Sequence, residues 1–326
     1  MSYLTQFLIV IPLLCLDFVI VIGQNNVPKH SPVKPKVPTG TILPIEESRS
    51  ARIPPDRAPK ALIVTAHPDD ETCFAATIYK ITKELGGTVD LAVITNGEAG
   101  YKYSTLAEDI YHLKLTDEAV GRENLPAIRK RELMAGGKYI GIRNYYFFDQ
   151  KDTHYTLDAD TVLRMVWNVE WVKHRLRELI EREHYDIVFT LLPAPETHGH
   201  HKAATIIALE VVCQLIEPAK PAVLGCGSGM KNDTIPIFHE LADYPITRCA
   251  VSSPIAALDK TQKFGFNNRL NYSIITSWVV AEHKSQGTMH LGFRSELENF
   301  WLFGENNPKT LSYVKDLFRR MANATP

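Results

Sequence analysis

Two short segments of the sequence bring together side chains that bind metal ions. The first, His67-Pro68-Asp69-Asp70-Glu71, places one imidazole and three carboxylates within five residues. Carboxylates crowded this closely repel one another unless a cation or the N-terminus of a helix offsets their charge. The second, His198-Gly199-His200-His201, places three imidazoles within four residues. Together the two segments hold the donor types that a divalent metal needs.

A divalent-metal site with one open position is the chemistry that these residues favour. Catalytic zinc typically takes three nitrogen or oxygen ligands from the protein and leaves the remaining position for water. His67, Asp70 and His201 would supply two nitrogens and one oxygen. Asp69, beside them, could act as general base for a water whose pKa falls to about 7 at such sites. His198 could stabilise or protonate the departing group.

Each segment also has an interpretation without catalysis. Asp-Asp-Glu at the start of a helix is often only a cap that compensates the helix dipole. A His-Gly-His-His loop alone could be an adventitious metal binder at the surface. The functional interpretation is favoured because both segments follow predicted strands of one sheet, where ligands gather at the carboxyl ends of the strands.

The elements that must position these residues alternate along the chain. Short apolar runs predict four buried strands, at Ala61–Ala66, Val89–Ile94, Asn144–Phe148 and Asp186–Leu191. Helical patterns lie between and after them, at Phe74–Leu85, Pro126–Lys138, Thr161–Arg182 and Lys202–Ile216. This alternation predicts an α/β fold with a mostly parallel sheet covered on both faces. The residues just after Ala66, Ile94, Phe148 and Leu191 are therefore where function is expected.

The rest of the chain is less regular. Gly225–Gly229 is interpreted as a turn, because its glycine spacing does not fit a dinucleotide fingerprint. Leu258–Phe266 and Ser277–Gln286 are candidate helices, and an apolar stripe from Leu311 to Phe318 predicts a last one.

The motifs resemble those of the PIG-L/LmbE-like family of zinc-dependent N-deacetylases. The resemblance rests on Ala-His-Pro-Asp-Asp-Glu after the first strand and a His-x-x-His after a later one. It extends over about residues 60 to 290, through Thr95-Asn96-Gly97-Glu98-Ala99-Gly100, Arg129-Lys130-Arg131-Glu132-Leu133 and His283-Lys284-Ser285-Gln286. It implies a Rossmann-like three-layer sandwich and hydrolysis of an N-acyl group on an amino sugar.

The resemblance also implies roles for individual residues. His67, Asp70 and His201 match the ligands of Zn²⁺, or of another divalent metal, Asp69 the general base, and His198 the histidine that stabilises the oxyanion or protonates the amine. Arg129 matches an arginine that contacts the substrate, and Glu98 lies in a loop near the sugar site. One motif departs from the family, whose second segment often reads His-Pro-Asp-His, because this chain has Gly199 and His200 instead.

Composition limits the other classes of function. The chain has 326 residues, 45% of them hydrophobic and 22% charged, which excludes a wholly disordered protein. Its formal net charge of -1 argues against a nucleic-acid binder, because counterion release needs a basic surface. None of the five cysteines forms a C-x-x-C pair, so a zinc ribbon or thioredoxin motif is not indicated.

The N-terminal part of the chain predicts export. Residues 4–22 are almost wholly apolar, so residues 1–23 are predicted to be a signal peptide or a membrane anchor. Residues 24–59 carry eight of the twenty prolines and form a predicted linker, followed by the deacetylase-like domain at 60–326. The protein is expected to be secreted, periplasmic or anchored outside the cytoplasm, with membrane contact only through the N-terminal segment.

The sequence thus predicts a metal-dependent hydrolase that removes the N-acetyl group from an N-acetylglucosamine-type sugar or glycoconjugate. Two alternatives remain open at this stage. One is a non-catalytic sugar-binding protein of the same fold, and the other is an amidase acting on another N-acyl sugar conjugate.

Overall fold

The computed structural model describes residues 57–216, 220–287, 294–304 and 308–326. The chain divides into two units, residues 1–53 and 54–326, and every described residue belongs to the second. The predicted signal peptide or anchor at 1–23, and residues 24–56 of the predicted linker, lie outside the described residues. Within the described ranges, no helix combines the length and the apolar character needed to cross a membrane.

A seven-stranded sheet forms the centre of this unit, with strand order β3-β2-β1-β4-β5-β9-β6. The strands are β1 (Lys60–Thr65), β2 (Thr88–Thr95), β3 (Ile142–Gln150), β4 (Ile187–Leu191), β5 (Ala222–Gly229), β6 (Ala256–Asp259) and β9 (Leu297–Leu302). Strands β1 to β5 pair in parallel, and β9 runs antiparallel to both of its neighbours. The expected mostly parallel sheet is therefore confirmed.

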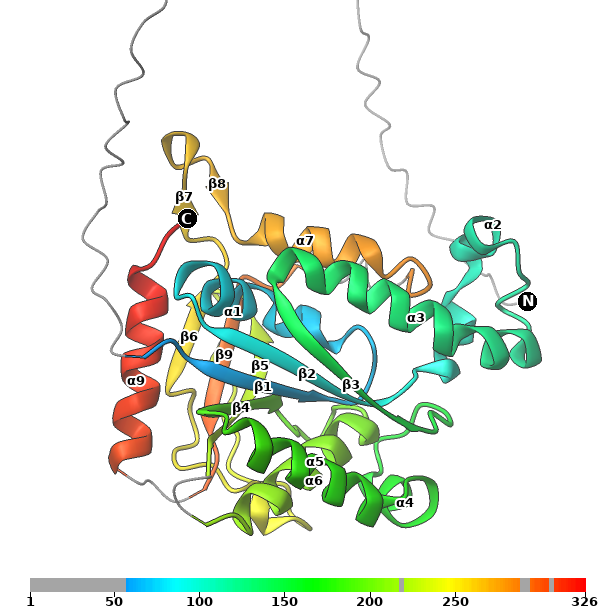
Figure 1. The fold of residues 1–326 in the computed structure, drawn as a ribbon, viewed down its shortest axis with the longest axis horizontal. Coiled ribbons are helices and arrows are strands. Elements are labelled where there is room, and N and C mark those ends of the chain that lie inside the picture. Colours follow the sequence, from blue (N-terminus) through cyan, green and yellow to red (C-terminus); the bar gives the residue numbers. More distant parts are fainter. Residues whose placement is uncertain (1–56, 217–219, 288–293, 305–307) are drawn as a thin grey trace, which may run out of the picture. The chain divides into compact units, whose positions relative to one another are not determined.

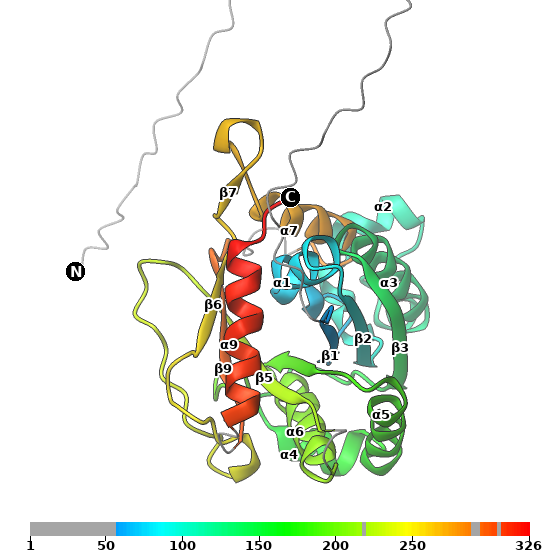
Figure 2. The same ribbon diagram turned by 60° about the vertical axis from the view of Figure 1, so that its left-hand side comes forward.

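Helices cover both faces of the sheet and complete three layers (Figures 1 and 2). On one face lie α1 (Ala75–Tyr79), α3 (Glu118–Ile140), α7 (Ser273–Glu282) and α9 (Pro308–Asn323), which share one apolar cluster with the sheet. On the other face lie α5 (Val169–Glu183) and α6 (Gly199–Cys213), which share a second cluster, and the short α4 (Ala159–Thr161), which contacts α6. The short α2 (Glu108–Tyr111) and the hairpin of β7 (Lys263–Phe264) and β8 (Leu270–Asn271) stand outside these layers.

Strand β1 shows why the sequence forms a sheet buried on both sides. Successive side chains of a strand point to opposite faces. Ala61 and Ile63 accordingly pack into the first cluster, while Leu62 and Val64 pack into the second. All four are fully buried, so an unbroken apolar run is what this strand requires.

Three sequence expectations about elements were wrong. The glycine-rich run Gly225–Gly229 is the end of strand β5 and not a turn. Residues 258–266 contain the end of β6 and the short strand β7 in place of a helix. The single long helix expected from Thr161 to Arg182 is interrupted at Trp167, whose backbone is extended, and α5 begins after Asn168, whose side chain accepts from the backbone N–H of Trp171.

The strand order places a topological switch point between β1 and β4. The connection after β1 leads to α1 on one face, whereas the connection after β4 leads to α6 on the other. Diverging connections leave a crevice at the carboxyl ends of these two strands, which is where open α/β sheets bind their ligands.

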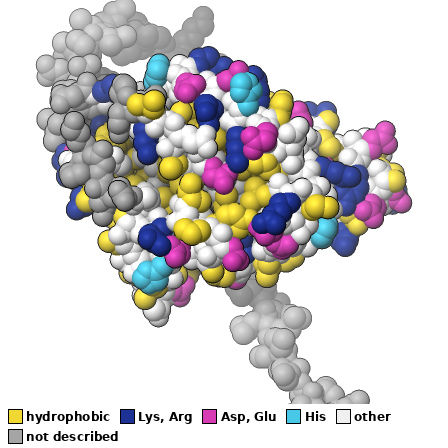
Figure 3. Space-filling model, turned by 90° about the horizontal axis from the view of Figure 1, so that it is seen from below, with side chains coloured by type: hydrophobic (Ala, Val, Ile, Leu, Met, Phe, Trp, Pro, Cys, Tyr) yellow, Lys and Arg dark blue, Asp and Glu magenta, His cyan; other side chains and the backbone are white. Residues whose placement is uncertain are grey.

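The face that lies at the bottom of Figure 1 carries helices α4, α5 and α6. Apolar side chains gather in a central band on this face, between charged groups (Figure 3). Met165 and Trp171 are among the exposed apolar side chains of the segment from α4 to α5, at 81% and 40% exposure. This face is distinct from the carboxyl edge of the sheet, where the candidate site lies.

Candidate metal centre

Strands β1 and β4 deliver the two predicted segments to the switch point. His67 follows β1, and a short 3-10 helix begins at Asp70. His198 is the N-cap residue of α6, and His201 lies in the first turn of that helix. The loops of both segments are thus fixed by a strand on one side and a helix on the other.

The structure brings His67, Asp70 and His201 together. Nδ1 of His67 lies 3.0 Å from Nε2 of His201, and this Nε2 lies 3.1 Å from Oδ1 of Asp70. Nδ1 of His67 also lies 3.8 Å from Oδ2 of Asp70. Three side chains from two distant segments therefore converge on one point, as the sequence predicted.

Backbone hydrogen bonds fix the carboxylate of Asp70. Its Oδ2 accepts from the backbone N–H groups of Ala66 at 3.0 Å and His67 at 2.8 Å, so Oδ1 is turned toward His201. Burial by itself would raise the pKa of Asp70, but the charges of His201 and His67 and the hydrogen bonds from their rings hold this pKa well below its usual range. The carboxylate is thus ionised and aimed before any ligand arrives.

This donor set fits a divalent cation. Zinc bonds of about 2 Å in tetrahedral geometry place neighbouring donor atoms about 3.3 Å apart, close to the separations of 3.0 and 3.1 Å seen here. Burial would lower the pKa of His67, yet the hydrogen bond with Asp70 and the charges of Asp152, Asp70 and Asp69 raise it to about 9. The carboxylates around His67 therefore attract positive charge. A zinc ion bound by two imidazoles and a carboxylate would supply that charge.

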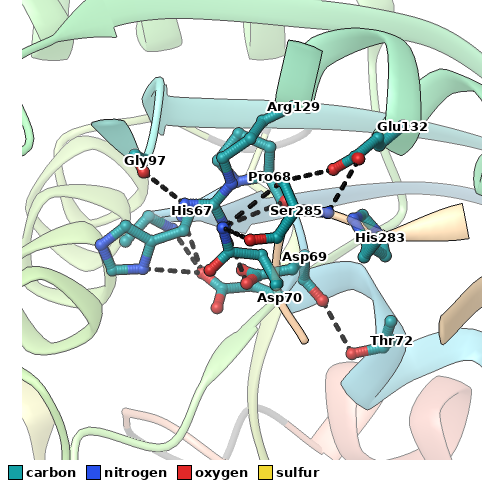
Figure 4. A network of polar contacts seen from close by, with 12 residues as sticks. His67, Pro68, Asp69, Asp70, Thr72, Gly97, Arg129, Glu132, His283 and Ser285 are labelled. Carbon is teal, nitrogen blue, oxygen red and sulfur yellow. Dashed lines mark hydrogen bonds and ion pairs between the residues drawn. The ribbon is translucent and has the colours of Figure 1, made fainter. Parts of the chain in front are cut away.

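Asp69 and Arg129 form an ion pair beside this donor set (Figure 4). Nη2 of Arg129 donates to Oδ2 of Asp69 at 2.7 Å and to the carbonyl of Pro68 at 3.3 Å, while Nη1 donates to the carbonyl of Gly97. The Arg129 side chain is only 3% exposed. Gly97 has a φ of +68°, and a Cβ there would lie 2.0 Å from Nη1 of Arg129. A glycine is needed at this position both for its backbone and for the space that the guanidinium fills.

His198 is held by the backbone of its own helix. Its Nδ1 accepts from the backbone N–H of His200 at 3.0 Å, so the proton of the neutral ring is on Nε2. Burial, followed by the charges of His67, His200 and His201, lowers the pKa of His198 to about 3. Its ring also packs edge-on against Tyr155, with the centroids 4.8 Å apart. His198 is thus fixed as a neutral hydrogen-bond donor.

His200 is fully buried, so the departure from the family motif does not expose it. Its Nδ1 lies 3.1 Å from Nε2 of His67 and 3.2 Å from Oδ1 of Asp152. Asp152 also approaches Nε2 of His67, at 3.9 Å. These two residues surround the side of His67 that faces away from Asp70 and His201.

Sequence reasoning missed Asp152. It lies two residues beyond the end of β3, and its side chain is 5% exposed. The signal was available, because the carboxyl end of the third strand was one of the four places where function was expected. The run Asp149-Gln150-Lys151-Asp152 stands there, and only the structure shows which of its two carboxylates turns inward.

Glu98 lies beside the site and supports its backbone. Its Oε1 accepts from the backbone N–H of Asp152 at 3.0 Å, and burial raises the pKa of Glu98. Its side chain is not among those that line the cavity described below. The expected contact between Glu98 and a sugar therefore stays a prediction.

Two further sets of contacts join residues 283–285 to the elements around the site. Nε2 of His283 lies 2.6 Å from Oε1 of Glu71, and both side chains are fully buried. Glu132 accepts from the backbone N–H and the hydroxyl of Ser285, at 2.9 and 2.6 Å (Figure 4). The late segment 283–286, singled out in the sequence by resemblance, thus packs against the first segment and against α3.

A cavity of about 440 Å³ opens above these groups. His67, Asp69, Asp70, His198 and His201 line it, and Arg129 and Asp152 also reach it. The rest of the wall is mixed in character and is formed by Thr72, Cys73, residues 99–103, Glu118, Arg122, residues 153–155 and Gln286. The predicted metal ligands and catalytic groups therefore share one solvent-accessible cavity.

Part of the chain matches the profile of a known family. The profile described as PIG-L, GlcNAc-PI de-N-acetylase, matches residues 62–212. Residues 62–212, called the PIG-L region below, are similar to this family. The PIG-L region runs from β1 to α6 and contains both metal-binding segments.

Curated proteins that are similar to this chain come from two bacilli. A protein of Bacillus cereus named probable N-acetyl-alpha-D-glucosaminyl L-malate deacetylase 2 is 23% identical over 162 residues. The match spans 50% of this chain and 64% of that relative. A protein of Bacillus subtilis (strain 168) with the same name is 24% identical over 194 residues, which span 56% of this chain and 76% of the relative.

Solved structures also resemble the chain at low identity. The N,N'-diacetylchitobiose deacetylase from Pyrococcus horikoshii superposes with a TM-score of 0.47 and 18% identity. That superposition covers 76% of this chain and 85% of the other. A deacetylase of the teicoplanin biosynthesis pathway superposes with a TM-score of 0.45 and 18% identity, over 76% of this chain and 99% of the other.

Proposed function

We propose that this protein is a metal-dependent hydrolase that removes the N-acetyl group from an N-acetylglucosamine-type sugar or glycoconjugate. The observation that carries the proposal is the convergence of His67, Asp70 and His201 on one point, with Asp69 beside them in the same cavity. The family description and the names of the two bacillus relatives support an N-acetylated glucosamine as the substrate class.

Two nitrogens and one carboxylate oxygen would hold a zinc ion, or another divalent metal, at the floor of the cavity. A bound metal supplies Lewis-acid polarisation of the amide carbonyl and lowers the pKa of water. Asp69 is suited to take the proton of that water. Within the described residues only its Oδ2 accepts a hydrogen bond, from Arg129, which leaves Oδ1 able to accept the proton.

His198 is suited to stabilise the negative charge that develops on the acetyl oxygen. Because its Nδ1 accepts from the backbone, Nε2 is the atom that carries a proton to donate. A donor fixed before the reaction costs no reorganisation when the charge forms. Removing one such donor typically costs about 10²–10³ in kcat.

The proposed reaction balances without a further reactant. The oxygen of water adds to the acetyl carbon, the bond between this carbon and the sugar nitrogen breaks, and the proton held by Asp69 passes to the amine. The products are acetate and the free amino sugar. Aromatic side chains of Tyr101, Tyr103 and Tyr155 form part of the outer wall, which suits a ligand with both apolar and polar faces.

We further propose that the protein acts outside the cytoplasm. The support is the apolar segment within residues 1–23, which lies outside the described residues. Expression of the full chain in its native host and N-terminal sequencing of the mature protein test this. A mature N-terminus near residue 24 would support a signal peptide, and recovery of the intact chain from membranes would support an anchor. Intact chain in the cytosol would refute the proposal.

The activity is tested by measuring acetate release from a panel of N-acetylated sugars and sugar conjugates. We expect release that a chelator abolishes and that added Zn²⁺ restores. The same panel with other acyl groups separates a deacetylase from an amidase of broader range. A metal-loaded protein that binds the sugars but releases neither acetate nor any other acid would contradict the proposal and favour a non-catalytic binding protein.

A further inference from the structure

We propose that Asp152 and His200 act as a pair of positioning residues that holds His67 in the one tautomer able to bind the metal through Nδ1. The inference rests on the proposed function, since it concerns the same metal site. It assigns a role to Asp152, which no sequence motif identified, and to His200, to which the resemblance gave no role. Neither residue is taken to bind the metal itself.

The argument begins with the two nitrogens of His67, which face different partners. Nδ1 faces Asp70 and His201, at 3.8 and 3.0 Å. Nε2 faces His200 and Asp152, at 3.1 and 3.9 Å. A neutral imidazole has one protonated and one bare nitrogen. The partners of one nitrogen therefore decide whether the other is available to a cation.

Proton accounting selects the tautomer. If Nδ1 of His67 binds a cation, the ring proton must sit on Nε2 and needs an acceptor in a buried place. Nδ1 of His200, at 3.1 Å, is within hydrogen-bond distance of this Nε2, and the carboxylate of Asp152, at 3.9 Å, places a negative charge beside it. With His200 as acceptor and the charge of Asp152 nearby, the proton stays on Nε2 and the lone pair of Nδ1 points toward Asp70 and His201. Loss of both groups would remove this preference.

The pair is itself held rigidly. The backbone N–H of Ala99 donates to Oδ2 of Asp152 at 3.3 Å, and the backbone N–H of Asp152 donates to Glu98 at 3.0 Å. Arg122 binds the carbonyl of Asp152 at 3.0 Å. Two of these contacts fix the backbone of Asp152 and one fixes its carboxylate, so the group is held in place to orient another side chain.

His200 is fixed by packing. Its side chain is fully buried and lies against Trp167, with ring centroids 5.4 Å apart. Because His200 follows the N-cap residue of α6 by two positions, its backbone is also set by the helix. Helix α6 therefore positions both His201, a proposed metal ligand, and His200, which contacts His67.

The test is the affinity of the full chain for Zn²⁺, measured by competition with a chromophoric chelator. Loss of an outer-shell partner of a metal-binding histidine typically weakens metal binding about 10–100-fold. We expect a loss of this size for Asp152→Asn and for His200→Ala. His200→Asn, which keeps a polar atom near the position of Nδ1, should recover part of the affinity.

Asp149→Asn is the matched control, because Asp149 lies near the end of β3, three residues before Asp152, but pairs with Lys130 at the surface. It should bind Zn²⁺ as the natural chain does. Circular dichroism of each metal-free variant shows whether it is folded. If His200→Ala fails to fold, the nearly isosteric Asp152→Asn and the polar His200→Asn carry the test.

The outcomes separate this inference from the proposed function. If the natural chain binds no Zn²⁺, or if His201→Ala binds it equally well, the proposed metal site is wrong. If the natural chain binds one Zn²⁺ that His201→Ala loses, while Asp152→Asn and His200→Ala keep full affinity, only the present inference is overturned. Two Zn²⁺ in the natural chain and one in His200→Ala would also overturn it, since His200 would then be a metal ligand.

Discussion

Asp69 and His201 line the same cavity, yet their partners assign them different tasks. The ring of His201 lies within 3.1 Å of both His67 and Asp70, whereas the carboxylate of Asp69 is held by Arg129. A residue among the donor atoms should matter for binding the metal. A residue beside them should matter for what happens to water once the metal is present.

Substitutions of these residues should therefore affect metal binding and turnover separately. We expect His67→Ala and His201→Ala to lose the metal, and Asp69→Asn to keep it while turnover falls by about 10²–10⁴-fold, the usual contribution of a general base. Zinc content and acetate release, measured on the same samples, check this. Equal loss of metal in all three variants would refute the division of roles.

Arg129 was predicted from resemblance to contact the substrate, and its position adds another possibility. Its buried guanidinium joins Asp69 to the carbonyls of Pro68 and Gly97. If its main task is to aim Asp69, Arg129→Lys should lower kcat by about 10²-fold with little change in KM, because small displacements of a reacting group are costly. Steady-state kinetics with the exposed Arg131→Lys as control measure this. A rise in KM at unchanged kcat would instead support the contact with substrate.

At the scale of elements, the sequence predicted best those strands whose apolar pattern matches their burial in the folded structure. The four buried strands and their carboxyl ends were predicted because an apolar run between loops is buried on both sides. The meeting of His67 with His201 followed from the order of parallel strands. Neither step required knowledge of side-chain contacts.

The elements that were missed depend on contacts between distant segments. The glycines of β5 look like a turn, but a Cβ at Gly225 would lie 2.8 Å from the ring of Phe303, and one at Gly227 would lie 3.1 Å from Trp301. The strand needs glycine so that these rings can pack on it. Asp152 escaped prediction for the same reason, because its partner His67 is far away in the sequence.

Strand β9 also supports the loop that carries the metal ligands. Glu298 of β9 is fully buried and accepts from the backbone N–H groups of Ala76 and Thr77, both at 3.0 Å, and from the Thr77 hydroxyl at 2.6 Å. These donors lie at the start of α1, directly after the 3-10 helix that begins with Asp70. An antiparallel strand at the far side of the sheet thus caps the helix behind the site.

Glu298→Ala should consequently destabilise the protein by about 3 kcal/mol, because three buried donors lose their acceptor. Urea unfolding monitored by circular dichroism measures the change. Glu296→Ala is the control, since its carboxylate accepts from the exposed backbone of Lys231 and should cost less than about 1 kcal/mol. A loss for Glu298→Ala no larger than that of the control would show that the cap is unimportant.

At the scale of the whole unit, charges join the amino ends of β1 and β3 to the carboxyl end of α5. Glu183, at the end of α5, accepts from Nζ of Lys60 in β1 at 2.9 Å and from Arg143 in β3 at 3.0 Å. Arg182 adds a contact at 3.1 Å. The hydrogen bond from Lys60 is the largest of the causes that lower the pKa of Glu183 to about 2.

The lowered pKa gives the stability a defined dependence on pH. A carboxyl group whose folded pKa lies below its unfolded value near 4.3 stabilises the native state above that value. The contribution is lost as the pH falls from about 4.3 toward 2. Partly exposed ion pairs contribute up to about 1 kcal/mol. Glu183→Gln should therefore lower the free energy of unfolding by about this amount at pH 6.

Urea unfolding of the natural chain and of Glu183→Gln at pH 6, 4 and 3 measures the dependence. The difference between the two should shrink as the pH falls, because protonated Glu183 resembles glutamine. Glu181→Gln on the same helix is the control, since Glu181 has no ion pair within the described residues. Its difference from the natural chain should stay small at every pH. A constant gap for Glu183→Gln between pH 6 and 3 would mean that its effect is not electrostatic, and that the amino ends of β1 and β3 and the carboxyl end of α5 are held together by packing alone.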